Sequence, residues 1–389
     1  MKIIFWISIA IIFYTFFGYG IVLFLLVKLR TIIKGKRKLP TVSNDALPTL
    51  TLIVAAYNEE HYIEEKIQNT LQLIYPAEKI QYIFVTDGST DNTPLISSKY
   101  APITLMHQPE RRGKIAAVHR AMQQVKTEVV IFTDANTYLN KEALMNICRH
   151  YSDETVGCVS GEKRVHIEDV SDATAGEGFY WKYESKLKQW DAELYSVVGA
   201  AGELFSVRTK LYEAVPPDTI LDDFMISLLI AEKGYRIVYE PDAYAKETSS
   251  ENVKEELKRK VRIAAGGIQS ILRLSSLLNG FRHPVLSFQY ISHRVLRWTI
   301  TPFLMILAFI LNAIIAFDTK EVLYEILFAL QLLFYLLALL GWVLERRQLR
   351  RKILFVPFYF CMMNYAVLAG IRRYFSGSQG AAWEKARRK

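Results

Sequence analysis

Val129–Thr137 reads VVIFTDANT, in which four apolar residues and a threonine lead directly into Asp134 and Asn136. A short apolar run of this kind predicts a buried strand that carries Asp134 to the carboxyl edge of a parallel sheet, where open α/β folds bind ligands. Because Asp134 and Asn136 are two residues apart, their oxygens can face one side and coordinate a hard divalent cation. The stretch also fits a strand followed by an Asx turn that binds nothing.

The sequence before this stretch repeats the same change from apolar to polar residues. Thr49–Ala56 leads into YNE at residues 57–59, and Ile80–Val85 leads into TDG at residues 86–88. Helical segments are predicted between the strands, and Asn58 is expected to cap the first of them. This alternation predicts an α/β domain with a mostly parallel sheet and a ligand cleft at its carboxyl edge. Neither GxGxxG nor GxxxxGK[ST] follows a predicted strand, which argues against a dinucleotide fold and a P-loop.

The second half of this domain carries another candidate site. Helices are predicted over Ala175–Leu194 and from Leu221-Asp222-Asp223 to about Lys233. The adjacent acids are explained by helix capping and the helix dipole, or one of them acts as a general base. Glu251–Leu278 is predicted to be a basic amphipathic helix on the inner leaflet of a membrane, weakened or bent at Gly266-Gly267.

Four apolar segments without charged residues are predicted to be membrane segments: Ile3–Val27, Trp298–Phe317, Ile326–Leu344 and Ile353–Ile371. The first is expected to be a retained anchor, because its apolar run is longer than that of a signal peptide and basic residues follow it. The 389-residue chain is therefore expected to divide into five parts. These are an N-terminal transmembrane helix (1–28), a cytoplasmic α/β domain (39–250), amphipathic interfacial helices (251–295), C-terminal transmembrane helices (296–374) and a basic tail (375–389).

The net charge of +9 is distributed in clusters beside the apolar segments. This is the positive-inside pattern, together with attraction to anionic lipid headgroups, and it argues against a nucleic-acid partner. It predicts a multi-pass protein of the cell membrane with the α/β domain in the cytoplasm. One conflict remains, because the basic loop Glu345–Lys352 and the basic tail lie on opposite sides if Ile353–Ile371 crosses the membrane. The alternative is that this segment is re-entrant or interfacial.

The three cysteines and seven histidines show no metal-ligand spacing, so no zinc site is expected. Other blocks resemble the family 2 glycosyltransferases of the GT-A fold, and above all their membrane-integrated branch, which includes cellulose, hyaluronan and poly-N-acetylglucosamine synthases. The matching blocks are AAYNEE (55–60), VTDGSTDNT (85–93), RRGKIAA (111–117), FTDANT (132–137) and LDDF (221–224).

The resemblance implies a UDP-sugar donor and assigns roles to individual residues. Tyr57 and Glu59 would line the uridine pocket, Asp87 would bond the uracil, and Lys114 would lie near the nucleotide. Asp134 and Asn136 match the DxD motif that holds Mg²⁺ or Mn²⁺ on the diphosphate, with Asn in place of the second Asp. Asp223 matches the base that deprotonates the acceptor hydroxyl for an inverting transfer.

The clearest departure concerns QxxRW, a motif typical of processive synthases. Residues 259–263 (RKVRI) occupy its expected place, where Arg262 could contact the diphosphate but Gln and Trp are missing. Arg297-Trp298, at the start of a span, is expected to be an interfacial anchor. The resemblance in span layout and C-terminal half predicts exopolysaccharide or cell-surface glycan synthesis, whereas the missing Trp favours the alternative, single-sugar transfer to a lipid-linked acceptor. A membrane scaffold or transporter with an inactive domain is the alternative from a different class.

Overall fold

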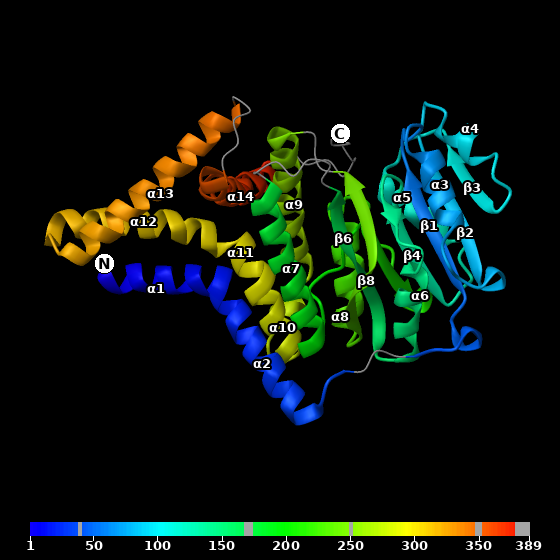
Figure 1. Cartoon of the computed structure of the whole chain (residues 1–389), viewed down its shortest axis with the longest axis horizontal. Helices are drawn as coiled ribbons and strands as arrows, with labels where there is room; N and C mark the ends of the chain where they lie inside the picture. Colours follow the sequence, from blue (N-terminus) through cyan, green and yellow to red (C-terminus); the bar gives the residue numbers. More distant parts are fainter. Residues whose placement is uncertain (38–40, 167–173, 249–251, 347–351, 378–389) are drawn as a thin grey trace.

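The computed structural model describes residues 1–37, 41–166, 174–248, 252–346 and 352–377. Of the predicted basic tail 375–389, residues 378–389 lie outside the described residues. The described chain forms an α/β domain with helices that project from one side of it (Figure 1).

One mixed sheet of eight strands organises the α/β domain, in the order β3-β2-β1-β4-β7-β6-β8-β5. The first four are parallel neighbours, β4, β7 and β6 are antiparallel neighbours, and β6 and β8 are again parallel. The strands are β1 (Leu50–Ala56), β2 (Ile80–Asp87), β3 (Ile103–Gln108), β4 (Val129–Asp134), β5 (Tyr138–Leu139), β6 (Val156–His166), β7 (Leu204–Arg208) and β8 (Arg236–Thr248).

Helices cover both faces of the sheet because its central strands are apolar on both sides. Every residue of β1 and β4 is buried. Ile53 and Phe132 pack on one face, and Leu52 and Ile131 pack on the other, as the two-residue period of a strand requires. The domain helices are α3 (Ile63–Leu71), α4 (Thr93–Ser97), α5 (Lys114–Met122), α6 (Ala143–Cys148), α7 (Thr174–Leu194) and α8 (Asp222–Glu232).

The parallel register brings the polar strand ends together, as the sequence predicted. Ala55 is paired with Val85 on one side and with Asp134 on the other, so β1, β2 and β4 end at one edge. The prediction that Asn58 caps the first helix was wrong. Asn58 has a φ of +50°, and its Oδ1 accepts a hydrogen bond from the Thr90 amide (2.9 Å). It therefore bridges two loops, and α3 begins at Ile63.

Within the described residues, four helical segments are long and apolar enough to cross a membrane by length and composition: Lys2–Lys34, Thr301–Thr319, Val322–Glu345 and Ile353–Phe375. The first consists of α1 (Lys2–Phe13), a π-helical turn (Tyr14–Gly18) and α2 (Tyr19–Lys34), and it bends between α1 and α2 (Figure 1). The other helices of this part are α9 (Val253–Arg273), α10 (Pro284–Tyr290), α11 (Leu296–Trp298), α12 (Ile300–Thr319), α13 (Val322–Arg346) and α14 (Lys352–Phe375).

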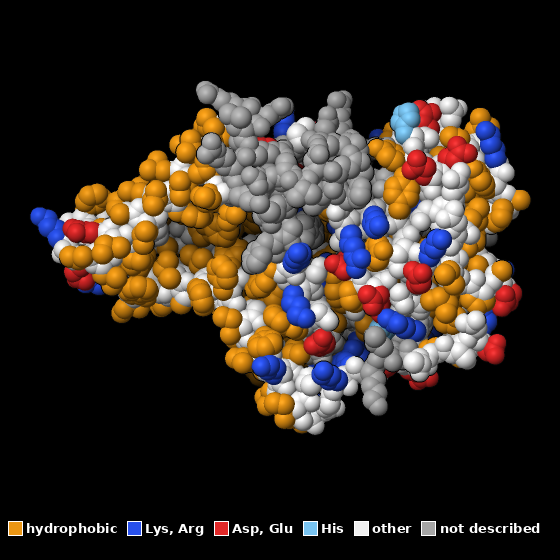
Figure 2. Space-filling view, viewed as in Figure 1, with side chains coloured by type: hydrophobic (Ala, Val, Ile, Leu, Met, Phe, Trp, Pro, Cys, Tyr) orange, Lys and Arg blue, Asp and Glu red, His pale blue; other side chains and the backbone are white. Residues whose placement is uncertain are grey.

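These helices fall into two groups. α1, α12 and α13 project away from the sheet, and hydrophobic side chains cover the projecting part up to a charged tip (Figure 2). At the end of this part, Lys2 forms an ion pair with Glu321 in the α12–α13 turn. In contrast, α2 packs on α7, and α14 packs along α9, where Figure 1 shows it foreshortened. Two of the four apolar segments therefore lie partly against the α/β domain and its flanking helix.

Gly266 and Gly267, predicted to weaken or bend the helix, lie within α9, which is continuous from Val253 to Arg273. Both glycines instead allow a close approach. A Cβ on Gly266 would lie 2.6 Å from Leu221 Cγ, and one on Gly267 would lie 2.4 Å from Trp298 Cε3. The missing side chains thus bring α9 against the start of α8 and against α11, which places α9 at the candidate site described below.

Candidate active site

A small cavity lies at the carboxyl ends of β1 and β2. It is lined by Ala55, Ala56, Tyr57, Asp87, Arg111, Gly113, Lys114 and Ala117. The Arg111 guanidinium stacks on the Tyr57 ring, 4.0 Å from its centroid. Three of the residues expected at the donor nucleotide, Tyr57, Asp87 and Lys114, are therefore together. Glu59 is not part of this lining: it is 2% exposed, and its amide donates to Thr93 Oγ1 (2.8 Å) beside the start of α4.

Asp87 holds the loop that covers this cavity. Its Oδ2 accepts hydrogen bonds from the amides of Arg112 (2.7 Å) and Gly113 (2.6 Å). Its buried Oδ1 accepts no hydrogen bond from the described residues, although Arg120 Nη1 lies 3.6 Å away. One carboxylate oxygen thus fixes the loop, and the other faces the Arg120 guanidinium.

Gly88 permits the close contact between this loop and β2. It has a φ of +68°, and a Cβ would lie 2.5 Å from Arg111 Cβ. We expect Gly88→Ala to cost about 1–3 kcal/mol of stability and to raise the KM for the donor, because Arg111 must move away from Tyr57. Thermal unfolding and donor titration measure both effects. Gly234→Ala is the control, since Gly234 has a φ of +91° with no atom within 4 Å of a Cβ. An equal donor KM in the two variants would contradict the role of Gly88 in the cavity.

Asp134 lies at the end of β4 and forms an ion pair with Lys114, 2.8 Å from Oδ1 to Nζ. The Lys114 ammonium is also 3.9 Å from Asp222 Oδ2. Burial alone would lower the pKa of Lys114, but Asp134 and Asp222, together with Asp223, outweigh burial and raise this pKa above its ordinary value. The Lys114 ammonium is thus shared between the carboxylates of Asp134 and Asp222.

The side-chain oxygens of Asp134 and Asn136 are of the type that Mg²⁺ and Mn²⁺ prefer. Asp134 and Asn136 are 8% and 7% exposed, respectively, at the same strand end. No group of three or more His, Cys, Asp or Glu side chains suited to a metal occurs within the described ranges. Asp134 and Asn136 can supply two oxygen ligands to such an ion.

Asp223 follows Asp222 in the first turn of α8, and the two carboxylates face different spaces. A Cβ on Gly202 would lie 3.0 Å from Asp223 Oδ2, so the missing side chain leaves room for this carboxylate. Burial, followed by the neighbouring Asp222 carboxylate, raises the pKa of Asp223 to about 7. A carboxylate with such a pKa can accept a proton near neutral pH, as a general base must.

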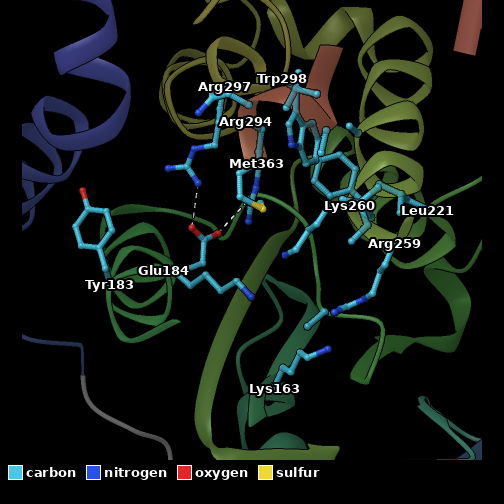
Figure 3. A pocket seen from close by; sticks show the side chains of 18 of the residues that line it. Lys163, Tyr183, Glu184, Leu221, Arg259, Lys260, Arg294, Arg297, Trp298 and Met363 are labelled. Carbon is cyan, nitrogen blue, oxygen red and sulfur yellow. Dashed lines mark hydrogen bonds and ion pairs between the residues drawn. The ribbon is translucent and has the colours of Figure 1, made fainter. Parts of the chain in front are cut away.

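A second and much larger cavity, of about 720 Å³, joins the α/β domain to the membrane-type helices. Asp134 and Asp223 both line it. The opposite wall is apolar and includes Phe16 and Phe17 of the π-helical turn and Phe355, Val356 and Phe360 of α14. Figure 3 shows Lys163, Arg259 and Lys260 on one side of it, and Arg294 and Arg297 directed to Glu184 on the other. The two carboxylates therefore share one cavity with several cationic side chains and an apolar wall.

Arg297 and Trp298 were predicted to anchor the chain in the membrane interface, and this was wrong. Arg297 Nη1 lies 3.2 Å from Glu184 Oε2, and the Trp298 ring packs on Phe224 of the LDDF block at 5.4 Å. Both residues line the large cavity. Residues 294–298 read RVLRW, which keeps the Arg and Trp of QxxRW with Arg294 in place of Gln. This five-residue pattern was the signal that the sequence interpretation missed.

Glu184 of α7 is a further residue that the sequence interpretation missed. It forms ion pairs with Arg294 (2.9 Å) and Arg297, and His293 Nε2 lies 3.3 Å from the same carboxylate. Burial would raise the pKa of Glu184, but these cations hold it well below its ordinary value. A charged Glu184 thus fixes the RVLRW segment against the domain.

The basic side chains of α9 also contribute to the site. Arg259 and Lys260 line the large cavity, where Arg259 Nη2 is 3.6 Å from Glu203 Oε1. Arg262, the residue expected at the diphosphate, is outside this lining and donates to the Ile220 carbonyl (3.4 Å). Burial lowers the pKa of Arg262 against the opposing effect of Asp222 and Asp223. Arg262 is therefore close to the carboxylates, but Arg259 and Lys260 are the cations of α9 that face the cavity.

Comparisons with known proteins agree with this geometry. Residues 51–215 match the family described as Glycosyl transferase family 2. Poly-beta-1,6-N-acetyl-D-glucosamine synthase of Staphylococcus aureus (strain COL) is 28% identical over 247 residues, which are 61% of this chain and 58% of that protein. The protein of the same name from Staphylococcus epidermidis is 25% identical over 235 residues, 58% of this chain and 56% of that protein. The matched region thus spans less than three fifths of these relatives.

A solved structure matches nearly the whole chain. The mannosyltransferase PcManGT from Pyrobaculum calidifontis, in complex with GDP-Man and Mn²⁺, has a TM-score of 0.73 and 24% identity, and the match covers 97% of this chain and 100% of that one. The likeness establishes the fold. The chain therefore has the GT-A fold, and residues 51–215, from β1 to β7, form a glycosyltransferase family 2 domain beside the apolar helices.

Proposed function

We propose that this protein transfers a sugar from a nucleotide-diphosphate donor, a UDP-sugar, to an acceptor hydroxyl in the large cavity. The observation that carries the proposal is that Asp134 and Asp223 line the same large cavity. Lys114, which forms an ion pair with Asp134, lines the small cavity beside it. Donor diphosphate and acceptor can therefore meet between the two carboxylates, which a single transfer reaction requires.

The chain's own residues supply the following steps. Tyr57, Arg111 and Asp87 would bind the nucleoside, and Lys114 would pair with the diphosphate. Asp134 and Asn136 would hold Mg²⁺ or Mn²⁺, which supplies positive charge for the leaving diphosphate when bound.

Asp223 would accept the proton of the acceptor hydroxyl as its oxygen attacks the anomeric carbon. The bond from that carbon to the diphosphate breaks on the opposite face, so the anomeric configuration inverts.

Two acceptor classes are compatible with the cavity. We favour a growing glycan, because the relatives are named as poly-N-acetylglucosamine synthases and Trp298 offers an aromatic face near Asp223 for a sugar ring. The second candidate is a lipid-linked acceptor. It is favoured by the apolar wall formed by Phe16, Phe17 and α14, which is suited to an alkyl chain.

We also propose that the α/β domain faces the cytoplasm of a multi-pass protein in the cell membrane. The basic clusters beside the apolar segments support this orientation. The packing of α14 along α9 favours the interfacial alternative for this segment, which would keep both basic segments on the cytoplasmic side. Labelling of single cysteines introduced at either end of α14, in intact cells, tests this topology.

The test of function is nucleotide release by the full chain purified in detergent. The donor panel would include UDP-glucose, UDP-N-acetylglucosamine and GDP-mannose, since a structure of the same fold is bound to GDP-Man. Each donor is tested with Mn²⁺, with Mg²⁺ and with EDTA, and the product is sized. A long product with one UDP-sugar supports glycan synthesis, and a single sugar on lipid supports the second candidate. Release with GDP-mannose alone overturns the UDP donor, and no release with any donor favours a scaffold or transporter.

The raised pKa of Asp223 predicts the pH dependence of this reaction. Since a general base must be ionised, kcat/KM should fall about tenfold per pH unit below pH 7 as Asp223 becomes protonated. Asp222→Asn removes the carboxylate that helps to raise this pKa, so the acid limb should move to lower pH. Profiles from pH 5 to 9 with one donor measure the shift. An acid limb at the same pH in both proteins would contradict the assignment of that limb to Asp223.

A further inference from the structure

Lys66 is a fully buried lysine behind the turn that carries Asp134 and Asn136. It lies on α3 with 0% exposure. Its Nζ donates to the Thr137 carbonyl (2.6 Å) and to Thr133 Oγ1 (3.1 Å). These two partners flank the turn, one at each end. The long lysine stem thus connects α3 to both sides of the candidate metal ligands.

The hydrogen bonds continue from Thr133 and Thr137 into the site itself. Thr137 Oγ1 donates to the Asp134 carbonyl (2.9 Å), which closes the turn. Thr133 Oγ1 donates to the Glu203 carbonyl (2.9 Å), next to Gly202, against which Asp223 lies. Lys66 is therefore one end of a network that joins the metal side of the site to the segment beside the proposed base.

A lysine in this position is unusual because no acid within the described residues forms an ion pair with it. Burial lowers the pKa of Lys66 to about 7, against the opposing effect of Asp134. Both the ammonium and the neutral amine have enough N–H groups for the two hydrogen bonds, so the geometry holds in either state. A buried amine that bonds only to the turn is costly for stability alone, since an apolar side chain could fill the same space.

We propose that Lys66 is a positioning residue for the metal-binding turn: it fixes the backbone at Thr133 and Thr137 so that Asp134 and Asn136 present their oxygens together. This inference rests on the proposed function, in which these two residues hold the metal. Groups that orient metal ligands in this way typically contribute 10- to 100-fold to metal affinity. Asp134 and Asn136 would be present but poorly aligned without Lys66.

The test compares Lys66→Met with a matched control, Lys79→Met. Lys79 also bonds backbone oxygens, those of Asn44, Asp45 and Leu47 (3.1, 2.7 and 3.0 Å). It precedes β2 at the opposite edge of the sheet. Thermal unfolding is followed while Mn²⁺ is titrated at a saturating UDP concentration. This readout needs no turnover, because a ligand that binds the folded state raises the unfolding temperature.

We expect Lys66→Met to need about 10- to 100-fold more Mn²⁺ for the half-maximal shift, and Lys79→Met to lower the unfolding temperature without changing this Mn²⁺ concentration. If Lys66→Met does not fold, Thr133→Val replaces it, since this change removes the oxygen that accepts from Lys66; a weaker Mn²⁺ response is again expected. If the wild type responds to Mn²⁺ and the Lys66 or Thr133 variant has the same Mn²⁺ midpoint, this inference is overturned but the proposed metal role is not. A wild type that does not respond to Mn²⁺ overturns the proposed metal role and this inference with it.

Discussion

Turnover should fall by about 10²- to 10⁴-fold in Asp223→Asn, the range over which general bases contribute to catalysis. The amide cannot take the proton of the acceptor hydroxyl, whereas its size and burial match those of the acid. Burial and Asp222 raise the pKa of Asp223 to about 7. Asp223 is therefore basic enough at neutral pH to act as the general base that the Asn variant lacks. Nucleotide release at saturating donor measures the decrease, and UDP binding should stay near that of the wild type.

The adjacent Asp222 is the matched control for this variant. Asp222 is 3.9 Å from the Lys114 ammonium and is not part of the large cavity lining, whereas Asp223 is. We therefore expect Asp222→Asn to lose far less turnover than Asp223→Asn. The opposite order would transfer the role of base to Asp222, and near-normal turnover in both variants would refute a carboxylate base at the start of α8.

Asp134→Ala should abolish stimulation by Mn²⁺ or Mg²⁺. A metal on a leaving diphosphate supplies several kcal/mol of charge stabilisation, so a loss of about 100-fold or more in turnover is expected. The change also frees Lys114 from its 2.8 Å ion pair, and the ammonium can then neutralise part of the diphosphate charge. Residual activity should consequently be insensitive to EDTA. Titration of Mn²⁺ against nucleotide release in both proteins measures this.

Asn136→Ala should have a smaller effect on activity than Asp134→Ala. Asn136 is neutral, so its loss removes one oxygen but no charge, and a higher Mn²⁺ requirement with an intact maximal rate is expected. Activity of Asp134→Ala that still rises with Mn²⁺ would show that other side chains hold the metal. Equal losses in the two variants would indicate that geometry, and not charge, dominates at this turn.

Local sequence patterns correctly predicted the parallel half of the sheet and the meeting of its polar strand ends. β1, β2 and β4 end within two residues of their predicted limits. The reason is that parallel strands of a right-handed α/β unit all end at the same edge. A polar residue that directly follows a buried apolar strand therefore lies at the carboxyl edge of the sheet. Asp87 and Asp134 were therefore placed at this edge without coordinates, whereas Tyr57 and Lys114 were singled out only by the family resemblance.

Predictions failed where a residue's partner lies far away in the chain. Asparagine is a residue type that often caps helices, but the side chain of Asn58 accepts a hydrogen bond from the Thr90 amide, 32 residues later. An arginine beside a tryptophan at the start of an apolar span is typical of a membrane anchor, but Arg297 donates a hydrogen bond to Glu184, 113 residues earlier. In both cases the local rule described what the residue can do, and a tertiary contact decided what it does.

By itself, then, the sequence determined the α/β class, the apolar helices and the polar strand ends that meet at one edge of the sheet, because strand period, apolar length and strand-end chemistry are local properties. The tertiary structure decided the lining of the large cavity. Helix packing alone sets which faces of α7, α9, α11 and α14 border the large cavity, and small residues such as Gly266 and Gly267 permit that packing. The placement of Arg259, Lys260 and Trp298 around Asp223, and of Lys66 beneath Asp134, depends on contacts between segments that are distant in sequence.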